Sequence, residues 1–295
     1  MSQNQVITLT YSDKLKAFGE LTKFRLSSLV VFSAAMTFLL AAKDHTDFLK
    51  LFSLVIGGFL VTVAANIINQ VKEIEIDKLM KRTANRPLPT GRLSKEEAML
   101  FGMACAVAGM LLLVVYVNVL TAAITFLSML LYGFVYTPLK SKTPLSVLVG
   151  AIPGALPPMI GWVAETGTLG IEAWVLFGIQ FIWQFPHFWA IAWILDDDYQ
   201  RVGFKMLPNG GGKDMNTAFQ IMIYTLFLLP LGMLPTQLGI TGPTSAIVAT
   251  ICGCMFLMTT FHLMKECTAK AARSILLGSV IYLPIVQIVY VFDKI

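Results

Sequence analysis

Nine long blocks of apolar residues dominate this sequence of 295 residues. A helix that crosses the hydrocarbon core of a bilayer needs about 20 residues, and lipid offers no partners to backbone polar groups, so each block must be helical. The blocks also lack the alternation of apolar and polar residues seen in strands of a membrane β-barrel. We therefore predict an all-α, polytopic membrane protein with nine transmembrane helices. The predicted spans are residues 26–42, 50–71, 97–117, 119–138, 144–164, 171–194, 216–236, 243–263 and 274–292.

The charged residues support this fold and orient it. Only 13% of the residues are charged, whereas a water-soluble domain carries about 25%. Nineteen of the 22 Lys and Arg residues fall before the first span or in loops on the same side as the N terminus. Because positive residues stay in the cytoplasm, we expect the N terminus inside and the C terminus outside (N-in/C-out). The net charge of +5 is thus explained by topology and does not indicate nucleic-acid binding.

The organisation of the chain indicates one domain over residues 1–295. Residues 1–25 are polar and no small-residue cleavage site follows the first apolar block, so we expect a retained first span. The four cysteines lie in or beside predicted spans without zinc-like spacing, which is typical of packing residues. The two longest loops, 72–96 and 196–216, both carry acidic clusters. We expect these loops to form an active site in the cytoplasm.

The first acidic cluster continues the second predicted span. Asn69, Glu73 and Asp77 are four residues apart, so a helix places them on one face, and Asn66 precedes them on the same stripe. Oxygen atoms are the ligands that Mg²⁺ prefers, and the ion is usually held by one or two carboxylates together with substrate phosphates. Polar groups inside a span are expensive and usually functional. This favours a magnesium site over a merely solvated helix end.

A basic loop follows directly. Arg82, Arg86 and Arg92 can present planar guanidinium groups to phosphate oxygens, and Lys140, at the end of the fourth span, could also reach a phosphate. Taken alone, a basic loop commonly does no more than set topology. Beside a carboxylate cluster, we interpret it as a diphosphate-binding site.

The second acidic cluster follows the sixth span. Asp196, Asp197 and Asp198 are adjacent, and neighbouring carboxylates repel one another unless a cation neutralises them. They therefore predict a second magnesium site, with a solvated loop as the alternative. Arg201 follows as a further candidate for binding diphosphate.

The sixth span itself is unusually polar. Gln180, Gln184 and His187 fall on one face of the predicted helix. A histidine inside a span faces a partner or a cavity rather than lipid. His187 is thus predicted to make either a hydrogen bond to another helix or a contact to a ligand such as a porphyrin.

The fifth span is rich in Gly and Pro. Gly150 and Gly154 are four residues apart and form a face for close helix packing. Pro153, Pro157 and Pro158 are expected to break this helix and to open the wall of a cavity.

Taken together, these motifs resemble a known family. The pattern Asn69-x₃-Glu73-x₃-Asp77, followed by Arg-Thr-x-x-Arg-Pro-Leu from residue 82, is similar to that of the intramembrane aromatic prenyltransferases. Within that superfamily, the segments 154–162, 186–188 and 198–208 resemble the branch that farnesylates protoheme IX. The resemblance covers nearly the whole chain. It departs from the usual pattern at Glu73, where the family has a second Asp, and at Phe24, where it often has Pro.

The resemblance implies a Mg²⁺-dependent reaction in which farnesyl diphosphate, protoheme IX and water give heme O and diphosphate. It implies a multi-pass protein of the bacterial cytoplasmic (inner) membrane, in contact with membrane lipid, and a downstream heme A synthase or terminal oxidase as partner. The implied metal ligands are Asn69, Glu73, Asp77, Asp196, Asp197 and Asp198, and all of these except Asp196 are also implied as catalytic. The implied diphosphate-binding residues are Arg82, Arg86, Lys140 and Arg201, and the implied substrate-binding residues are Tyr136, Gln184, His187 and Tyr199.

Two other functions are alternatives at this level. A related membrane prenyltransferase would act on a quinone precursor such as 4-hydroxybenzoate, but the Pro-His-Phe and Met-Leu-Pro segments argue for heme. A secondary transporter also has spans broken at Pro and Gly, yet it places its charged sites near the middle of the membrane. Here the carboxylates lie at the edge of the spans, which suits an enzyme that takes up a soluble diphosphate.

Overall fold

The computed structural model describes residues 10–42, 45–208 and 211–295. Within these residues, nine helical segments are long and apolar enough to cross a membrane. They coincide with the nine predicted spans, with ends that differ by a few residues, and the protein is an all-α, multi-pass membrane protein. The segments are α2 (Phe24–Ala41), α3 (Phe48–Lys72), α5 (Lys95–Tyr116), the unit of α6, η1 and α7 (Val119–Leu139), α8 (Ser146–Thr166), α9 (Ile171–Ile194), α11 (Met215–Gln237), α12 (Pro243–Glu266) and α13 (Ala269–Phe292).

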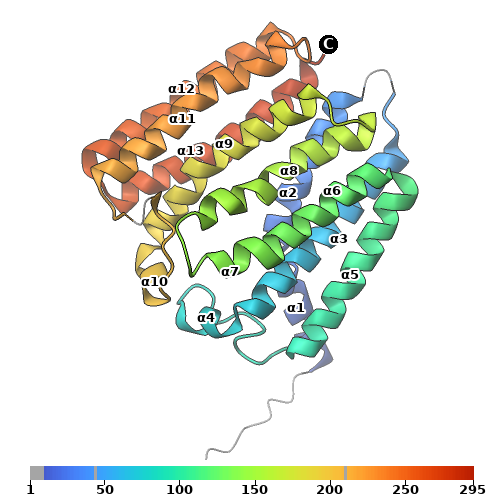
Figure 1. Ribbon diagram of the computed structural model, residues 1–295, viewed down its shortest axis with the longest axis vertical. Helices are drawn as coiled ribbons and strands as arrows, with labels where there is room; N and C mark the ends of the chain where they lie inside the picture. The colour runs from blue at the N-terminus through green and yellow to red at the C-terminus, as the bar shows by residue number, and fades with distance from the viewer. Residues whose placement is uncertain (1–9, 43–44, 209–210) are drawn as a thin grey trace, which may run out of the picture.

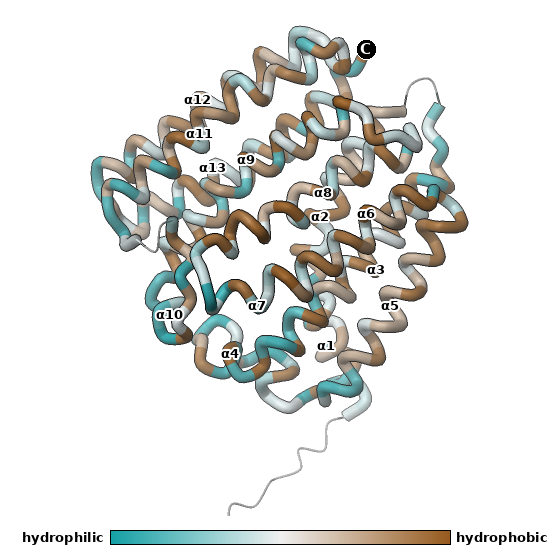
Figure 2. Tube along the Cα trace, in the orientation of Figure 1, coloured by the Kyte–Doolittle hydropathy of each residue, from teal (hydrophilic) through white to brown (hydrophobic). Residues whose placement is uncertain are grey.

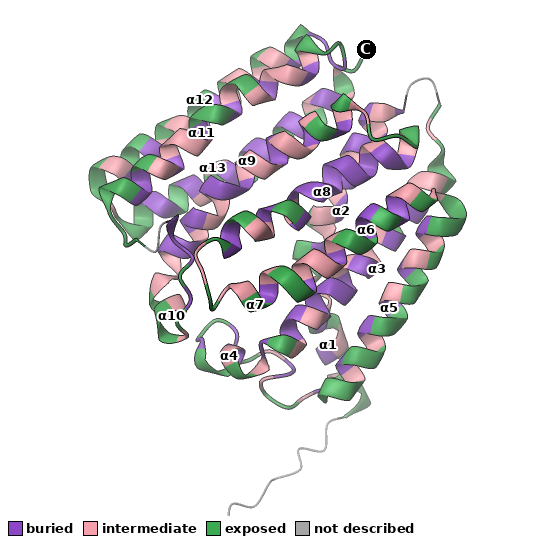
Figure 3. Cartoon of the chain, in the orientation of Figure 1, coloured by how far each residue is buried: buried purple, intermediate pink, exposed green. Residues whose placement is uncertain are grey.

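These helices lie side by side in one bundle, with α5 at one flank and α11 and α12 at the other (Figure 1). Helix α8 lies in the middle and packs against α2, α6 and α9. It contributes to both clusters of buried apolar side chains, one with α2, α3, α5 and α6 and the other with α9, α11, α12 and α13. The outward sides of α5 and α12 are exposed (Figure 3), and Leu100, Val115 and Met258 there are each more than half exposed. Large apolar side chains on the outside suit contact with lipid.

Three short helices were not predicted as separate elements. They are α1 (Tyr11–Leu21), α4 (Ile74–Leu79) and α10 (Asp196–Arg201). All three lie at the same end of the bundle, where Figure 2 shows hydrophilic segments. We call this end, together with the turn that carries Lys140, the polar end. Helix α1 buries Leu21 and exposes Tyr11, so it lies on the bundle with one face.

The prediction that three prolines break the helix of the fifth span was wrong, because α8 runs unbroken through them. A helical N–H normally bonds to the carbonyl four residues earlier, so Pro157 and Pro158 leave two such carbonyls free. Ser128 Oγ donates to the first at 3.2 Å, and Gln180 Nε2 donates to the second at 2.8 Å. Side chains of neighbouring helices thus replace the lost backbone bonds, which is how proline is tolerated inside a membrane helix.

We expect Gly161→Ala to destabilise the bundle. A Cβ atom at Gly161 would lie 1.9 Å from the carbonyl oxygen of Ala34 and 2.2 Å from Thr37 Oγ1, so α2 and α8 would have to move apart. Overpacking of this kind costs about 1–3 kcal/mol, and thermal unfolding in detergent should show a lower midpoint. Gly178→Ala is the control, since nothing lies within 4 Å of a Cβ atom there. A parental midpoint for Gly161→Ala would contradict the close contact.

Candidate active site

The first acidic motif lies at the polar end, where α3 passes into α4. Glu73 is the junction between the two helices, but its N–H still bonds to Asn69 O at 3.1 Å, and Asp77 N–H bonds to Glu73 O at 2.7 Å. The helical spacing therefore continues through the junction. Asn69, Glu73 and Asp77 are all buried. A row of buried oxygen-bearing side chains is unusual in a helix and requires partners.

Two cations are those partners. Lys140 Nζ lies 2.8 Å from Glu73 Oε1, and Arg86 Nη1 lies 2.7 Å from Asp77 Oδ2. The lysine comes from the end of the fourth span and the arginine from the loop after α4. Thus the structure brings together two of the predicted diphosphate-binding residues and two of the predicted metal ligands. Their binding roles stay predictions.

Lys23 is a third cation that the sequence analysis missed. It has a positive φ of 46° directly before α2, which turns the chain into the bundle. Burial and the positive charges of Arg86 and Lys140 lower the pKa of Lys23 to about 7, although Glu73 and Asp77 act in the opposite direction. Three basic side chains therefore lie near two carboxylates. An anionic ligand beside Lys23 would raise its pKa and stabilise its charged form.

One oxygen atom of the site has no partner. Asp77 is fully buried, and among the described residues nothing donates a hydrogen bond to its Oδ1. A buried polar atom without a partner is costly. An oxygen-seeking cation such as Mg²⁺ would satisfy it, so the residues present fit a magnesium ion.

The second acidic motif lies on α10 at the same end. The side chains of Asp196 and Asp198 are 16% exposed, but that of Asp197 is 86% exposed. A hydrogen bond from Lys213 Nζ at 3.0 Å holds the pKa of Asp197 below its usual value, and Arg201 and Lys81 act in the same direction. Among the three aspartates, Asp196 and Asp198 are therefore the better placed to face the bundle.

The two motifs do not form a closed metal cage. In the described part of the chain, no three His, Cys, Asp or Glu side chains are grouped closely enough to hold a metal ion by themselves. Mg²⁺ commonly keeps water and binds through one or two carboxylates plus substrate phosphates. The arrangement suits an ion that arrives with a phosphorylated ligand.

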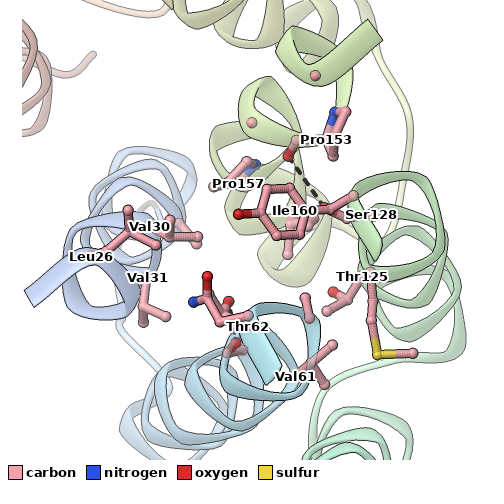
Figure 4. A pocket seen from close by; sticks show the side chains of 18 of the residues that line it. Leu26, Val30, Val31, Val61, Thr62, Thr125, Ser128, Pro153, Pro157 and Ile160 are labelled. Carbon is pink, nitrogen blue, oxygen red and sulfur yellow. Dashed lines mark hydrogen bonds between the residues drawn. The ribbon is translucent and has the colours of Figure 1, made fainter. Parts of the chain in front are cut away.

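A cavity of about 220 Å³ begins next to these charges. Its lining is mostly apolar and comes from α2, α3, α6, η1 and α8, with Phe188 and Met206. Leu26 and Val30 line one side, and Pro153 and Pro157 of α8 line another, as expected for a cavity wall (Figure 4). Tyr136 also lines it, and its ring lies 4.8 Å from Lys140 Nζ. The mostly apolar cavity therefore lies next to the charged cluster of Glu73, Asp77, Arg86 and Lys140.

Four other predicted site residues lie around this core. Arg82 is exposed in the loop after α4, and Arg201 is half-exposed and lies 3.5 Å from Asp198. Tyr199 is partly buried, with its ring 6.0 Å from that of Phe204. Gln184 donates through Nε2 to Ala151 O of α8 at 2.9 Å and does not line the cavity.

His187 points toward α13 and not into the cavity. Its Nδ1 lies 2.8 Å from Ser279 Oγ, and its ring stacks on Trp183 at 4.7 Å. Gln184 and Gln180 donate to carbonyl groups of α8, and Gln180 Oε1 also accepts from Gln287 of α13 at 3.2 Å. Of the two predictions for His187, the hydrogen bond to another helix is therefore confirmed.

Arg92 pairs with a carboxylate that the sequence did not suggest. Its guanidinium group binds both carboxylate oxygens of Glu20 in α1, at 2.8 and 2.6 Å, and donates to Asn85 O at 2.7 Å. These bonds fasten the basic loop to α1. Arg92 thus supports the loop, and its role in binding phosphate stays a prediction.

Comparisons with known proteins show the family of this chain. Residues 29–281 match the UbiA prenyltransferase family. A protoheme IX farnesyltransferase of Cytophaga hutchinsonii is 51% identical over 96% of this chain and 99% of its own length. One of Christiangramia forsetii is 47% identical over 95% of this chain and 94% of its own length.

Solved structures share the fold. A structure described for digeranylgeranylglyceryl phosphate synthase aligns with a TM-score of 0.78 at 21% identity, over 95% of this chain and 98% of that one. A UbiA homologue from Archaeoglobus fulgidus bound to DMAPP and Mg²⁺ aligns with a TM-score of 0.74 at 14% identity, over 93% and 97% of the two chains. The chain therefore belongs to the UbiA prenyltransferase family, in the group formed with the protoheme IX farnesyltransferases.

Proposed function

We propose that this membrane prenyltransferase transfers a farnesyl group from farnesyl diphosphate to a vinyl group of protoheme IX and thereby makes heme O. The bond between farnesyl C1 and the diphosphate oxygen breaks, and a bond from C1 to the vinyl group forms. Water adds to the remaining vinyl carbon as a hydroxyl group, and a proton is released with the diphosphate. The observation that carries the proposal is the charged cluster at the mouth of an apolar cavity, in a chain 51% identical to a protoheme IX farnesyltransferase.

The charged residues bind the diphosphate and stabilise its departure. Lys140 lies beside Tyr136 of the cavity wall, and Lys23 is near both Lys140 and Arg86, so we place the leaving diphosphate among these three residues. Preorganised charges of this kind commonly supply the largest part of catalysis. The exposed Arg82 and Arg201 attract the anion to the polar end.

Magnesium would supply further charge neutralisation for the leaving diphosphate when bound. Asn69, Glu73 and Asp77 would hold it from one side, and the cluster Asp196–Asp198 would hold it from the other. The orphaned Asp77 Oδ1 supports this assignment.

The cavity protects the allylic cation from water. The three aliphatic hydroxyl groups that line it, beside the phenols of Tyr132 and Tyr136, each donate to a backbone carbonyl: Thr62 to Gly58 O, Thr125 to Thr121 O and Ser128 to Pro153 O. Their protons are thus committed, and the remaining walls are mostly apolar. The farnesyl chain is shielded while the cation exists.

His187 is proposed to contact protoheme. Ser279 Oγ gives its only proton to Leu276 O at 2.6 Å, so it can only accept from His187. With the Ser279 proton given to Leu276 O, the tautomer that completes this network carries its proton on Nδ1, which leaves Nε2 as the nitrogen for iron. The next residue, Phe188, lines the cavity.

We expect His187→Ala to weaken protoheme affinity by about 10-fold, since loss of an interaction at a metal commonly costs 10–100-fold. Affinity for farnesyl diphosphate should stay parental. An absorbance titration with protoheme measures the first and calorimetry the second. His262→Ala is the control, because His262 is exposed and lies beside Glu266 at 3.4 Å. Equal protoheme affinity in His187→Ala and the parent would remove the role.

The proposed function also fixes an orientation in the membrane and a recipient for the product. The polar end faces the cytoplasm of a bacterium, where soluble diphosphate is available, and the C terminus lies outside, in line with the distribution of positive residues. Residues 1–295 act as one catalytic domain. A heme A synthase or terminal oxidase receives the product.

The test is product formation in vesicles that contain the purified protein. Farnesyl diphosphate is supplied with either protoheme IX or 4-hydroxybenzoate, with Mg²⁺ or with EDTA. We expect a hydroxyfarnesylated heme by mass, with diphosphate released, only when protoheme and Mg²⁺ are both present. Prenylated 4-hydroxybenzoate would indicate the quinone pathway instead. If no diphosphate were released under any of these conditions, the assignment of an enzymatic function would be wrong.

A further inference from the structure

The fourth span contains a turn of π-helix directly beside the first acidic motif. This turn, η1 (Leu131–Tyr136), lies between α6 (Val119–Leu130) and the short α7 (Thr137–Leu139). A π-helical turn is rare and is frequent at functional sites. It is pressed closely onto α3, because a Cβ atom at Gly133 would lie 2.8 Å from Ile68 Cγ2. Ile68 is the neighbour of Asn69, so the turn is positioned to touch the motif.

Thr137, at the end of this turn, makes that contact. Its hydroxyl donates to Tyr132 O at 2.9 Å, which binds a carbonyl within the π-turn. Asn69 Nδ2 lies 3.1 Å from the same hydroxyl oxygen. Both Thr137 and Asn69 are buried. The contact is therefore shielded from competing water.

The count of protons fixes the direction of the second bond. A hydroxyl group has one proton and two lone pairs, and the proton of Thr137 is committed to Tyr132 O. The hydroxyl can thus only accept from Asn69. If the amide were turned over, Asn69 Oδ1 and Tyr132 O would compete for the single proton of Thr137, and one of the two hydrogen bonds would be lost.

We propose that Thr137 is a positioning residue that keeps Asn69 Oδ1 turned toward the ligand. With Nδ2 held by Thr137, Oδ1 is the atom left for the face that carries Glu73 and Asp77. No described residue donates a hydrogen bond to this oxygen. The amide is held ready to give an oxygen ligand to a metal ion bound with diphosphate. This inference rests on the proposed function for its ligand.

The experiment compares Thr137→Val, Thr137→Ser and the parent in Mn²⁺ binding, measured by electron paramagnetic resonance with inorganic diphosphate present. Valine has a similar shape but no hydroxyl, whereas serine keeps it. We expect Thr137→Val to weaken Mn²⁺ binding about 10- to 100-fold, the usual effect of losing a partner that orients a metal ligand. Thr137→Ser should stay within a few-fold of the parent. Protoheme affinity, from an absorbance titration, should be unchanged in both variants.

A double variant tests whether Thr137 acts through Asn69. In the background of Asn69→Ala, Thr137→Val should have no further effect on Mn²⁺ affinity. If Thr137→Val does not fold, Thr137→Ala removes the same hydroxyl with less bulk on the helix. Parental Mn²⁺ affinity in a folded variant without the hydroxyl would overturn the inference, as would an undiminished effect in the Asn69→Ala background.

The proposed function and this inference can fail separately. A parent protein that binds Mn²⁺ with diphosphate but does not farnesylate protoheme would refute the proposed acceptor only. The Mn²⁺ affinities would still decide the role of Thr137. A parent that does not bind Mn²⁺ with diphosphate would overturn both.

Discussion

Asp77→Asn should lower the rate of heme O formation on the order of 10³-fold, while the protein stays inserted and folded. Asparagine has nearly the same shape, but it cannot carry the negative charge that faces Arg86 at 2.7 Å. It also replaces one of the two oxygen atoms by an NH₂ group, at a residue whose Oδ1 has no partner among the described residues. Removal of a preorganised electrostatic group at a reaction centre costs about 10²–10³-fold, and loss of metal affinity adds to that. Heme extraction from vesicles after a timed incubation measures the rate.

Glu75→Gln is the matched control for this change. Glu75 lies on the same short helix, but its side chain is 81% exposed and pairs with Lys78 at 2.8 Å. Exposed ion pairs contribute little, so Glu75→Gln should keep the parental rate. If Asp77→Asn produced heme O within a few-fold of the parent, the assignment of the metal site to α3 and α4 would be wrong.

Gly58→Leu should change the preferred prenyl donor from farnesyl to geranyl diphosphate. Gly58 lines the cavity, and a Cβ atom there would meet only Val31 Cγ2, at 3.8 Å. A larger side chain can therefore enter the cavity without displacing backbone. With a rise of 1.5 Å per residue, Gly58 lies about 12 Å along α3 from Asn66, at the charged end, and Leu54 lies about 18 Å from it.

The lengths of the two donors decide the outcome. An extended chain of single bonds reaches about 1.2 Å per bond. By that measure a farnesyl chain needs roughly 13 Å and a geranyl chain roughly 8 Å. The third isoprene unit would thus meet the new leucine, and the shorter chain would end before it. Steric discrimination in an apolar pocket is worth about 10–200-fold, and we expect a shift of on the order of 100-fold in the ratio of kcat/KM values.

Competition between the two donors, with products separated by mass, measures that ratio. Gly58→Ala is the control, because its Cβ atom makes only an ordinary contact. Leu54→Ala should act in the opposite direction, since Leu54 lines the cavity one helical turn further along α3 and is buried. An unchanged preference for farnesyl in an active Gly58→Leu protein would show that the chain lies elsewhere.

The spans and the first acidic motif could be predicted from the sequence for a simple reason. Apolar length and the spacing of four residues are local properties of a helix, and both survive folding unchanged. The motif even continues across the junction at Glu73, where two backbone hydrogen bonds keep the helical register. The ion pairs with Arg86 and Lys140 join residues nine and 67 positions apart, and only their shared end of the bundle suggested them.

The sequence was least informative where a side chain from another helix determines the local structure or the partner of a residue. Proline predicts a broken helix, but Gln180 and Ser128 of other helices satisfy the freed carbonyls of α8. The pairing of Arg92 with Glu20 of α1 was likewise not predictable, because the two residues are 72 positions apart. Lys23 precedes the first span as one of several basic residues. Only its left-handed backbone, which turns it into the site, distinguishes it from them.

The pairing of Glu73 with Lys140 and of Asp77 with Arg86 has a consequence for the order of substrate capture. A divalent ion alone would bind the two carboxylates and leave Lys140 and Arg86 without partners. Diphosphate alone would bind the two basic residues and leave Glu73 and Asp77 without partners. Each ligand alone would therefore leave buried charge unmatched, which is strongly unfavourable. When the two arrive together, every acid and every base exchanges one partner for another. Under the proposed function, the site should therefore bind the pair of Mg²⁺ and diphosphate better than either component alone, with each component raising the affinity for the other by the same factor.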